Sequence, residues 1–212
     1  DVEFWQSTGR DSEVVRWERP RVTAAPTTVS KGPRRELRAM AFSDFKGFSR
    51  LDEGQVVVFF DKVMGAVSAA IDGFGCPILA RNSWGDGLYL VFTSVREAAR
   101  CMLALQRTIA DLDFASLGLP PDMGLRIGVH AGPVFPTVDP VTQQPSFFGT
   151  HVTRTARVEP RTPPGEVYAT GSAAALLALE PLPDVTPEYV GQLQLAKDYR
   201  SEERRVGKEW GG

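Results

Sequence analysis

The sequence predicts an α+β fold whose core follows the order β-α-β-β-α-β. Strands and helices alternate along the chain, and a tight hairpin joins two consecutive strands in the middle. The helices are expected on one face of a sheet that contains antiparallel strands. With 212 residues, 42% hydrophobic and 24% charged, the chain can form one sizeable domain with extensions.

The first strand is a mostly apolar run, residues 39–43, that ends at Asp44. A glycine turn at Lys46-Gly47 and a new pattern come next. A buried strand ending in a carboxylate, then a glycine turn and a helix start, is where such folds often hold metals and phosphates. Asp44 is therefore the first candidate functional residue. This stretch leaves open the alternative that Asp44 only ends the strand or caps the next segment.

An amphipathic helix is expected to begin after Asp52-Glu53 and to end near Asp72-Gly73. The acidic pair suits a helix N-terminus, and the glycine suits a helix end. The apolar residues of this segment recur at steps of three and four, namely Val57, Phe60, Met64, Val67 and Ile71.

The hairpin consists of strands 77–83 and 88–92 around Trp84-Gly85-Asp86-Gly87. In the predicted sheet, its tip lies beside the end of the first strand, so Asp44 and Asp86 would meet. Two adjacent carboxylates repel each other unless a cation lies between them. Because such oxygen ligands suit Mg²⁺ or Mn²⁺, the sequence indicates a divalent metal site here.

The remaining elements complete the core and add to it. His130 lies in an apolar strand, where a satisfied core histidine is more common than a catalytic one. Residues 136–145 are expected to form a loop. The other elements expected are a helix over 95–112, a strand over 125–134, a helix over 150–159, a strand over 165–170, a helix over 172–179 and a strand over 189–195. This is the split βαβ, ferredoxin-like arrangement.

Composition divides the chain into three segments: an N-terminal extension and linker (1–36), the folded domain (37–199), and a charged end (200–212) expected to be a disordered tail or an artefact. The net charge of −2 suggests no nucleic-acid partner. No apolar run approaches the roughly 20 residues that span a bilayer, so no membrane segment is expected. Cys76 and Cys101 show neither metal-binding spacing nor a disulfide framework, which indicates a cytoplasmic protein.

Four blocks of sequence carry a resemblance. They are F-S-D-F-K-G-F-S (Phe42 to Ser49), W-G-D-G-L-Y-L-V-F (Trp84 to Phe92), R-I-G-V-H-A-G-P-V (Arg126 to Val134) and F-G-T-H-V-T-R-T-A-R-V-E (Phe148 to Glu159). In order and spacing they resemble the catalytic domain of class III nucleotide cyclases, over roughly Arg35 to Lys197. Each block alone would be weak evidence, but four in register are specific.

The resemblance implies that a ribonucleoside triphosphate is cyclised to its 3′,5′-cyclic monophosphate with release of pyrophosphate. Asp44, Asp86 and the Phe45 carbonyl would hold two divalent metals, which activate the 3′-hydroxyl and bind the triphosphate. Arg157 would stabilise charge on the α-phosphate.

The resemblance also implies phosphate contacts and a homodimer. The turn formed by Lys46, Gly47, Phe48 and Ser49 would offer backbone N–H groups to the phosphates. Lys197 resembles the lysine that pairs with the terminal phosphates, although it could equally be a solvated lysine at a strand end. Each site would combine metal ligands from one subunit with the arginine of the other.

Three positions depart from the family pattern. Thr153 replaces the usual asparagine four residues before the arginine, which gives a shorter hydroxyl in place of an amide. Asn82 and Ser146 replace the pair that selects the purine, so the sequence assigns no base. These short neutral groups could serve another base, including a pyrimidine as in the uridylate and cytidylate cyclases of bacterial antiphage systems.

Three functional hypotheses are consistent with these residues. The intact Asp44, Asp86 and Arg157 favour an active cyclase that makes a second messenger. The three departures instead favour a catalytically weak cyclase-homology domain that binds a nucleotide or a partner and regulates. The third hypothesis is a ferredoxin-like domain that only dimerises.

Overall fold

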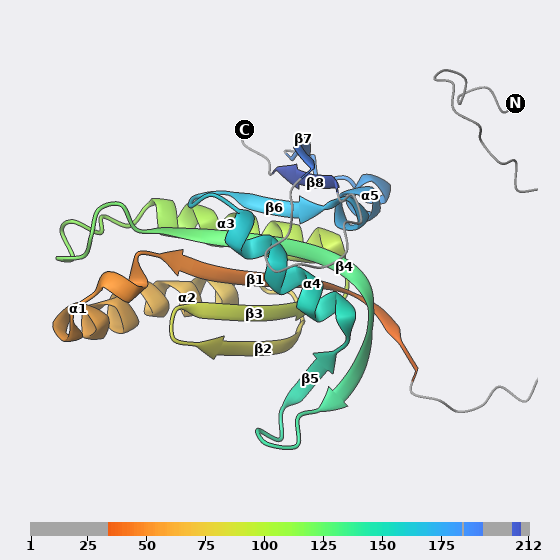
Figure 1. The fold of residues 1–212 in the computed structure, drawn as a ribbon, viewed down its shortest axis with the longest axis horizontal. Helices are drawn as coiled ribbons and strands as arrows, with labels where there is room; N and C mark the ends of the chain where they lie inside the picture. The colour runs from red at the N-terminus through yellow and green to blue at the C-terminus, as the bar shows by residue number, and fades with distance from the viewer. Residues whose placement is uncertain (1–33, 184, 193–204, 209–212) are drawn as a thin grey trace, which may run out of the picture. The chain divides into compact units, whose positions relative to one another are not determined.

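The computed structural model describes residues 34–183, 185–192 and 205–208 (Figure 1). The chain divides into two units, Asp1–Gly32 and Pro33–Gly212, and the described residues belong to the second. The strands are β1 (Glu36–Lys46), β2 (Ile78–Trp84), β3 (Gly87–Phe92), β4 (Gly124–Val138), β5 (Pro145–Phe148), β6 (Val167–Thr170), β7 (Glu188–Gln192) and β8 (Arg205–Lys208). The α-helices are α1 (Glu53–Val58), α2 (Gly65–Gly73), α3 (Val95–Ala110), α4 (Thr150–Val158) and α5 (Gly171–Leu179).

The sheet confirms the predicted fold class. Its order is β2-β3-β1-β4-β6-β8-β7, and β5 pairs with the far end of β4. The first four strands are each antiparallel to their neighbours and have the ferredoxin-like order. Beyond them, β6 runs parallel to β4, and this step starts the C-terminal additions.

Strand β1 lies inside the sheet, between β3 and β4, and both of its faces are covered. Ala41 and Phe45 point into the main core, which they share with residues of α2 and α3. Met40 belongs to a second cluster, with Tyr89 and Phe147. Side chains alternate between faces along a strand, so residues 40, 42 and 44 share the second face. Asp44 therefore lies on the face opposite the main core.

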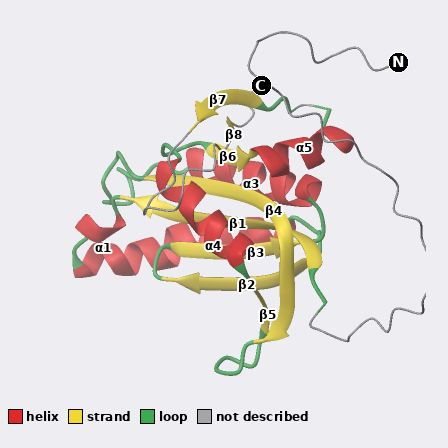
Figure 2. Cartoon of the chain, turned by 45° about the vertical axis from the view of Figure 1, so that its right-hand side comes forward, coloured by secondary structure: helices red, strands yellow, loops and turns green. Residues whose placement is uncertain are grey.

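The helices cover the sheet unequally (Figure 2). Helices α2 and α3 cover one face, as expected for the core. Helix α4 crosses the other face, where its buried Thr155 hydroxyl lies 3.9 Å from the sulfur of Met40. The starts of two helical segments are fixed by capping boxes, Asp52 with Gln55 and Ser94 with Glu97.

The expected loop over residues 136–145 is wrong in part, and the expected tail or artefact over 200–212 stays a prediction. Residues 136–138 and 145 are not loop, because β4 continues to Val138 and pairs with β5. The Asp139 carboxylate closes the intervening turn by accepting hydrogen bonds from the backbone N–H groups of Val141 and Thr142. The expected tail also contains a strand, since β8 pairs with both β6 and β7. A four-residue strand in a charged run gives too short a pattern to recognise.

One helical run among the described residues, Glu53–Gly73, is long and apolar enough by length and composition to cross a membrane. No such run was expected from the sequence. It comprises α1, a π-helical stretch (Phe59–Met64) and α2. A core helix of a soluble protein passes the same test, and Val63, Val67 and Ile71 of this run belong to the core shared with α3.

Candidate active site

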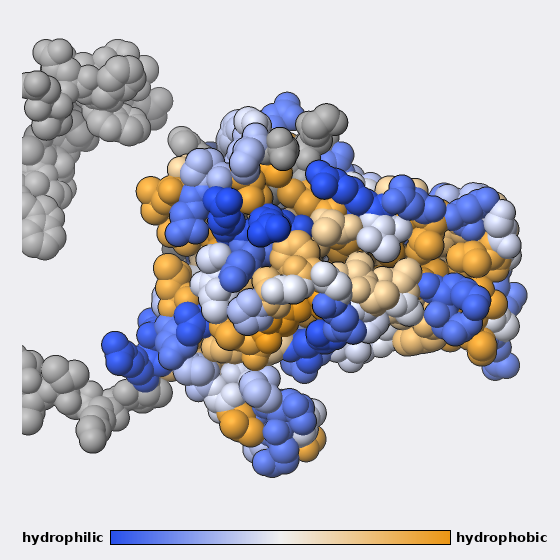
Figure 3. All heavy atoms as spheres, turned by 180° about the vertical axis from the view of Figure 1, so that it is seen from behind, coloured by the Kyte–Doolittle hydropathy of each residue, from blue (hydrophilic) through white to orange (hydrophobic). Residues whose placement is uncertain are grey.

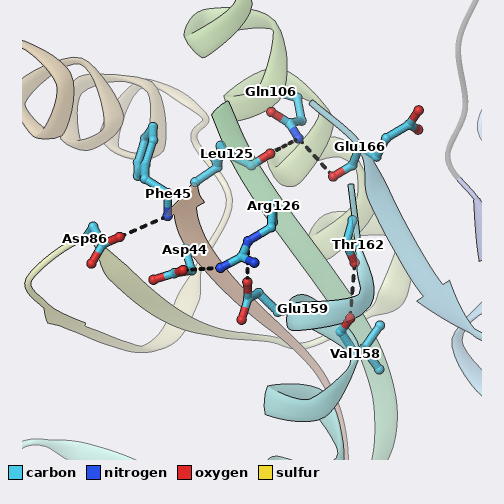
Figure 4. Close-up of polar contacts among 10 residues, drawn as sticks. All are labelled: Asp44, Phe45, Asp86, Gln106, Leu125, Arg126, Val158, Glu159, Thr162 and Glu166. Carbon is cyan, nitrogen blue, oxygen red and sulfur yellow. Dashed lines mark hydrogen bonds and ion pairs between the residues drawn. The ribbon is translucent and has the colours of Figure 1, made fainter. Parts of the chain in front are cut away.

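The structure brings Asp44 and Asp86 together, as the sequence predicts. Asp44 lies near the end of β1, and Asp86 lies in the tight turn between β2 and β3. The backbone N–H of Phe45 donates a 3.2 Å hydrogen bond to Oδ2 of Asp86, which ties the hairpin tip to β1 (Figure 4). Burial, reinforced by the charge of Asp44, raises the pKa of Asp86 to about 6. Burial and the neighbouring Asp44 charge therefore both disfavour ionisation of Asp86.

Arg126 is a cation to which the sequence assigned no role. It lies directly opposite Asp44 in the register of β1 and β4, and its guanidinium forms an ion pair with Asp44 Oδ2. The strand around it is fixed from behind, because buried Gln106 of α3 donates 2.9 Å hydrogen bonds to the carbonyls of Leu125 and Glu166. Arg126 thus sets the orientation of the Asp44 carboxylate.

Glu159 is a second residue without an earlier role. It directly follows α4, and its Oε1 lies 3.0 Å from Arg126 Nε; the angle is poor for a hydrogen bond, so the contact is an ion pair. Burial raises the pKa of Glu159 to about 7, although Arg126 acts in the opposite direction. Arg126 therefore bridges the Asp44 carboxylate at the end of β1 and the Glu159 carboxylate at the end of α4 (Figure 4). The only sequence signal was an arginine opening an apolar strand.

The turn after β1 differs in detail from the expectation. Gly47 has φ of 96°, which a residue with a side chain rarely adopts, and the chain then makes a three-residue 3₁₀ turn, Phe48–Arg50. Helix α1 begins only at Glu53, so this turn is not the helix N-terminus itself. Lys46 is exposed and lies 3.9 Å from the Asp122 carboxylate.

Helix α4 carries Thr153 and Arg157 on one side. Its buried face consists of Thr155 and Val158, which pack towards the sheet. Thr153 and Arg157 are one turn apart, and at 3.6 residues per turn they lie on the side away from that buried face. Thr153 is exposed and Arg157 is partly exposed. Within the described residues, Thr153 and Arg157 thus do not face Asp44 of the same chain.

The two candidate base-selecting residues lie on strands that pack together. Asn82 is partly exposed on β2, opposite Tyr89 of β3. Ser146 is partly exposed on β5, opposite Thr137 of β4. Ala80 of β2 and Phe147 of β5 both belong to the second core cluster, which joins these strands. Lys197 lies outside the described residues.

A family model described as the adenylate and guanylate cyclase catalytic domain matches residues 33–201. The chain belongs to this family.

Solved cyclase structures share the fold. The adenylyl cyclase CyaB from P. aeruginosa is 15% identical with a TM-score of 0.68, covering 84% of this chain and 96% of its own. An adenylate cyclase from Trypanosoma brucei, solved in its monomeric state, is 19% identical with a TM-score of 0.68, covering 85% and 92%. The guanylate cyclase domain of RhGC from Catenaria anguillulae, in complex with GTP, is 16% identical with a TM-score of 0.66, covering 83% and 96%. No curated protein gives a significant match.

Family membership gives the site a context. In this cyclase domain, the carboxylate pair, Arg126 and Glu159 form one connected cluster where β1 ends and β4 begins. The cyclases of similar fold are described as adenylyl and as guanylyl enzymes, so the fold does not distinguish between the two bases.

Proposed function

We propose that the protein is a nucleotide cyclase that converts a ribonucleoside triphosphate to its 3′,5′-cyclic monophosphate and pyrophosphate, and so makes a second messenger. One observation carries the proposal. In a domain of the cyclase family, Asp44 and Asp86 come from separate elements and converge where β1 ends, tied by the Phe45 N–H. Two converging carboxylates repel each other, and Arg126 pairs with only one of them, so the arrangement favours binding of a further cation.

The residues at this end of β1 fit two divalent metal ions, Mg²⁺ or Mn²⁺. Asp44 and Asp86 supply the carboxylate oxygens that these ions prefer, with the Phe45 carbonyl as a further ligand. Burial, and after it the charge of Asp44, raises the pKa of Asp86, and a bound cation would oppose both effects by favouring the ionised carboxylate. Divalent ions bound here would favour ionisation of the 3′-hydroxyl and balance the charge of the triphosphate.

The chain's own residues would prepare the site before the nucleotide arrives. Arg126 holds the Asp44 carboxylate in a fixed orientation, which lowers the cost of organising the site. The turn over Lys46, Gly47, Phe48 and Ser49 would present N–H groups to the phosphates. Arg157 would stabilise the charge that develops on the α-phosphate, because its planar guanidinium offers several donors. Lys197 remains a candidate partner of the terminal phosphates.

We further propose a homodimer with two shared sites. Thr153 and Arg157 lie on the side of α4 away from the sheet, where a second subunit could use them. The β4–β5 arm stands away from the body and carries hydrophobic residues among hydrophilic ones (Figure 3). Among these, Val138 is 58% exposed and Val141 89% exposed, which suits burial in an interface. A cytoplasmic location remains a proposal, supported by the unpaired Cys76 and Cys101.

The base remains the least determined part of the proposal. Family membership favours ATP or GTP as the substrate. Asn82 and Ser146 offer short neutral hydrogen-bonding groups, which could also accept a pyrimidine.

A second candidate function is a regulatory domain that binds a nucleotide without turning it over. Thr153 favours it, since a hydroxyl replaces the amide that could orient the ribose. Asn82 and Ser146 favour it as well, because neither restores the purine-selecting pair.

Turnover assays separate the two candidates. The protein at high concentration is incubated with Mn²⁺ and each of ATP, GTP, UTP and CTP, and products are identified by mass spectrometry. A 3′,5′-cyclic product from at least one nucleotide is the expected result. Binding of a nucleotide without product would instead favour the regulatory domain, and neither binding nor product would exclude both.

A further inference from the structure

The two histidines of the sequence, His130 and His151, form one hydrogen-bonded pair. His130 Nε2 lies 2.8 Å from His151 Nδ1. The ring planes are within 10° of each other and the centroids are 5.1 Å apart, about the N···N distance plus the radii of the two rings. The rings therefore meet edge to edge in nearly one plane, which is the geometry of an N–H···N hydrogen bond rather than of a face-to-face stack.

The pair joins α4 to the sheet. His130 lies on β4 and is 1% exposed, and His151 lies in the first turn of α4. A Cβ atom on Gly132 would lie 2.1 Å from His151 Nδ1, so only glycine leaves room for the ring. At the other end of the helix, a Cβ on Gly128 would lie 2.6 Å from the backbone nitrogen of Glu159. Helix α4 thus docks along β4 through two gaps four residues apart.

The hydrogen-bond network favours one direction for each bond. The Ala131 carbonyl can only accept, so the Ser172 hydroxyl donates to it at 3.0 Å. With its hydrogen so used, Ser172 Oγ can only accept, and the Thr170 hydroxyl at 3.0 Å is a nearer donor than His130 Nδ1 at 3.3 Å.

The same reasoning assigns the histidine tautomers. Because the Thr170 hydrogen is committed, Thr170 Oγ1 accepts from His130 Nδ1 at 2.8 Å. His130 is buried, where the uncharged ring is favoured, so its Nε2 has no hydrogen and accepts from His151 Nδ1. One directed chain of hydrogen bonds therefore runs from His151 on α4 to the β6–α5 junction.

We propose that His151 is a positioning residue of the cyclase, which holds α4 in the register that presents Thr153 and Arg157. The inference rests on the proposed function, because it is Arg157 that would act on the nucleotide. His151 precedes Thr153 by two residues and Arg157 by six, on the same short helix. The reaction slows when the helix that carries a catalytic group docks loosely, because misplacement of that group by about 1 Å can lower the rate by up to about 10²-fold.

The first test observes the hydrogen bond in the wild-type protein. Because the chain contains two histidines, labelling histidine with ¹⁵N gives an NMR spectrum of only four ring nitrogens. The expected result is a through-bond coupling between His151 Nδ1 and His130 Nε2, with both rings in the Nδ1–H tautomer. The absence of this coupling together with Nε2–H tautomers would overturn the assignment.

The second test uses a matched pair of variants. Asparagine places an N–H donor where His151 has Nδ1, whereas leucine keeps bulk without a donor. We expect His151→Leu to lower kcat about tenfold with little change in KM, and His151→Asn to stay within about twofold of wild type. Gly132→Ala should reproduce the leucine result by displacing the ring. Equal activity of His151→Leu and wild type, or equal loss in His151→Asn and His151→Leu, would refute the proposal.

Hydrogen exchange makes the outcome independent of turnover. In His151→Leu, the backbone amides of α4 should exchange about tenfold faster, while those of α3 stay unchanged. If the wild type forms no cyclic product, the proposed function fails, and the NMR and exchange measurements still decide whether His151 positions α4. Unchanged exchange in α4 would refute that role.

Discussion

Two regions of the molecule carry candidate catalytic residues, but they differ in their surroundings. One is the carboxylate cluster at the end of β1, and the other is the outer row of α4, which consists of Thr153 and Arg157. Asp44 and Asp86 are held within one chain by Phe45 and Arg126. Thr153 and Arg157 lie on the side of their helix away from the sheet that supports it. The first region is held together by contacts within its own domain, whereas the second lies on the outer side of its helix, where the proposed dimer would place a second subunit.

The largest effect is expected from the carboxylate cluster. Asp44→Asn removes the charge that would hold a divalent ion, so cyclase activity should fall about 10³-fold or more. Turnover with Mn²⁺ measures this loss, and the melting temperature checks the fold. Asp72→Asn is the matched control, because Asp72 is an exposed aspartate that pairs with Arg81 away from the cluster. Unchanged activity in Asp44→Asn would show that the metal assignment is wrong.

The outer row of α4 should give the next largest effect. Arg157→Lys keeps the charge but loses the planar set of donors, so kcat should fall about 10²-fold. Steady-state kinetics should show little change in KM, because the interaction is expected to strengthen in the transition state. Arg161→Lys serves as the control, since it makes the same change at an exposed position just beyond the helix. A loss confined to KM would instead assign Arg157 to ground-state binding.

The sequence was more informative about the carboxylate cluster than about its cations. Asp44 and Asp86 each end or join predicted strands, so the sheet order alone brings them together. Arg126 and Glu159 were missed because their pairing depends on register and on where α4 docks, which local pattern does not contain. The pairing of β5 with the end of β4 was missed because the prolines and polar residues of segment 136–145 favour a loop.

The outer row of α4 was found by resemblance, and its orientation came from the structure. The sequence places Thr153 and Arg157 one turn apart, but the buried side of α4 depends on the contacts of Thr155 and Val158 with the sheet. The sequence assigned His151 no role of its own beyond its place in the block Phe148 to Glu159. Its partner His130 is 21 residues away in the sequence. His130 was predicted to be a core histidine, without a contact to His151.

A gain of activity is expected from one substitution in the outer row of α4. Thr153→Asn restores the amide that the resemblance expects, and one added hydrogen bond to a substrate group is worth about 1 kcal/mol. We expect kcat/KM to rise several-fold towards tenfold, measured with the preferred nucleotide. A Thr153→Ser variant, which keeps a hydroxyl, should change little. A loss of activity in Thr153→Asn would indicate that the threonine is adapted to a different sugar contact.

The smallest effect concerns stability without metal. Asp86 and Glu159 have pKa values raised to about 6 and about 7. Both hold a proton more tightly in the folded state, so they contribute stability that is present below pH about 4 and lost as pH rises through these values. As Asp86 and Glu159 lose their protons, the melting temperature in EDTA should therefore fall between pH 5 and pH 7.5.

Two comparisons isolate the two groups. Glu159→Gln should flatten this decline, because glutamine does not titrate. Added Mg²⁺ should raise the melting temperature more at pH 7.5 than at pH 5, since the cation binds the ionised carboxylates. The same slope in Glu159→Gln and wild type would contradict the role of Glu159, and a pH-independent effect of Mg²⁺ would contradict the role of Asp86.

Mixing two inactive variants tests most directly whether the two regions belong to different subunits of one site. Asp44→Asn and Arg157→Ala are each expected to be inactive alone. After reassortment of a homodimer, half of the dimers contain one site with both Asp44 and Arg157 intact, so the mixture should recover about a quarter of wild-type activity. Recovery at that level is the predicted result. A mixture that stays inactive although exchange of subunits is demonstrated would contradict the shared site.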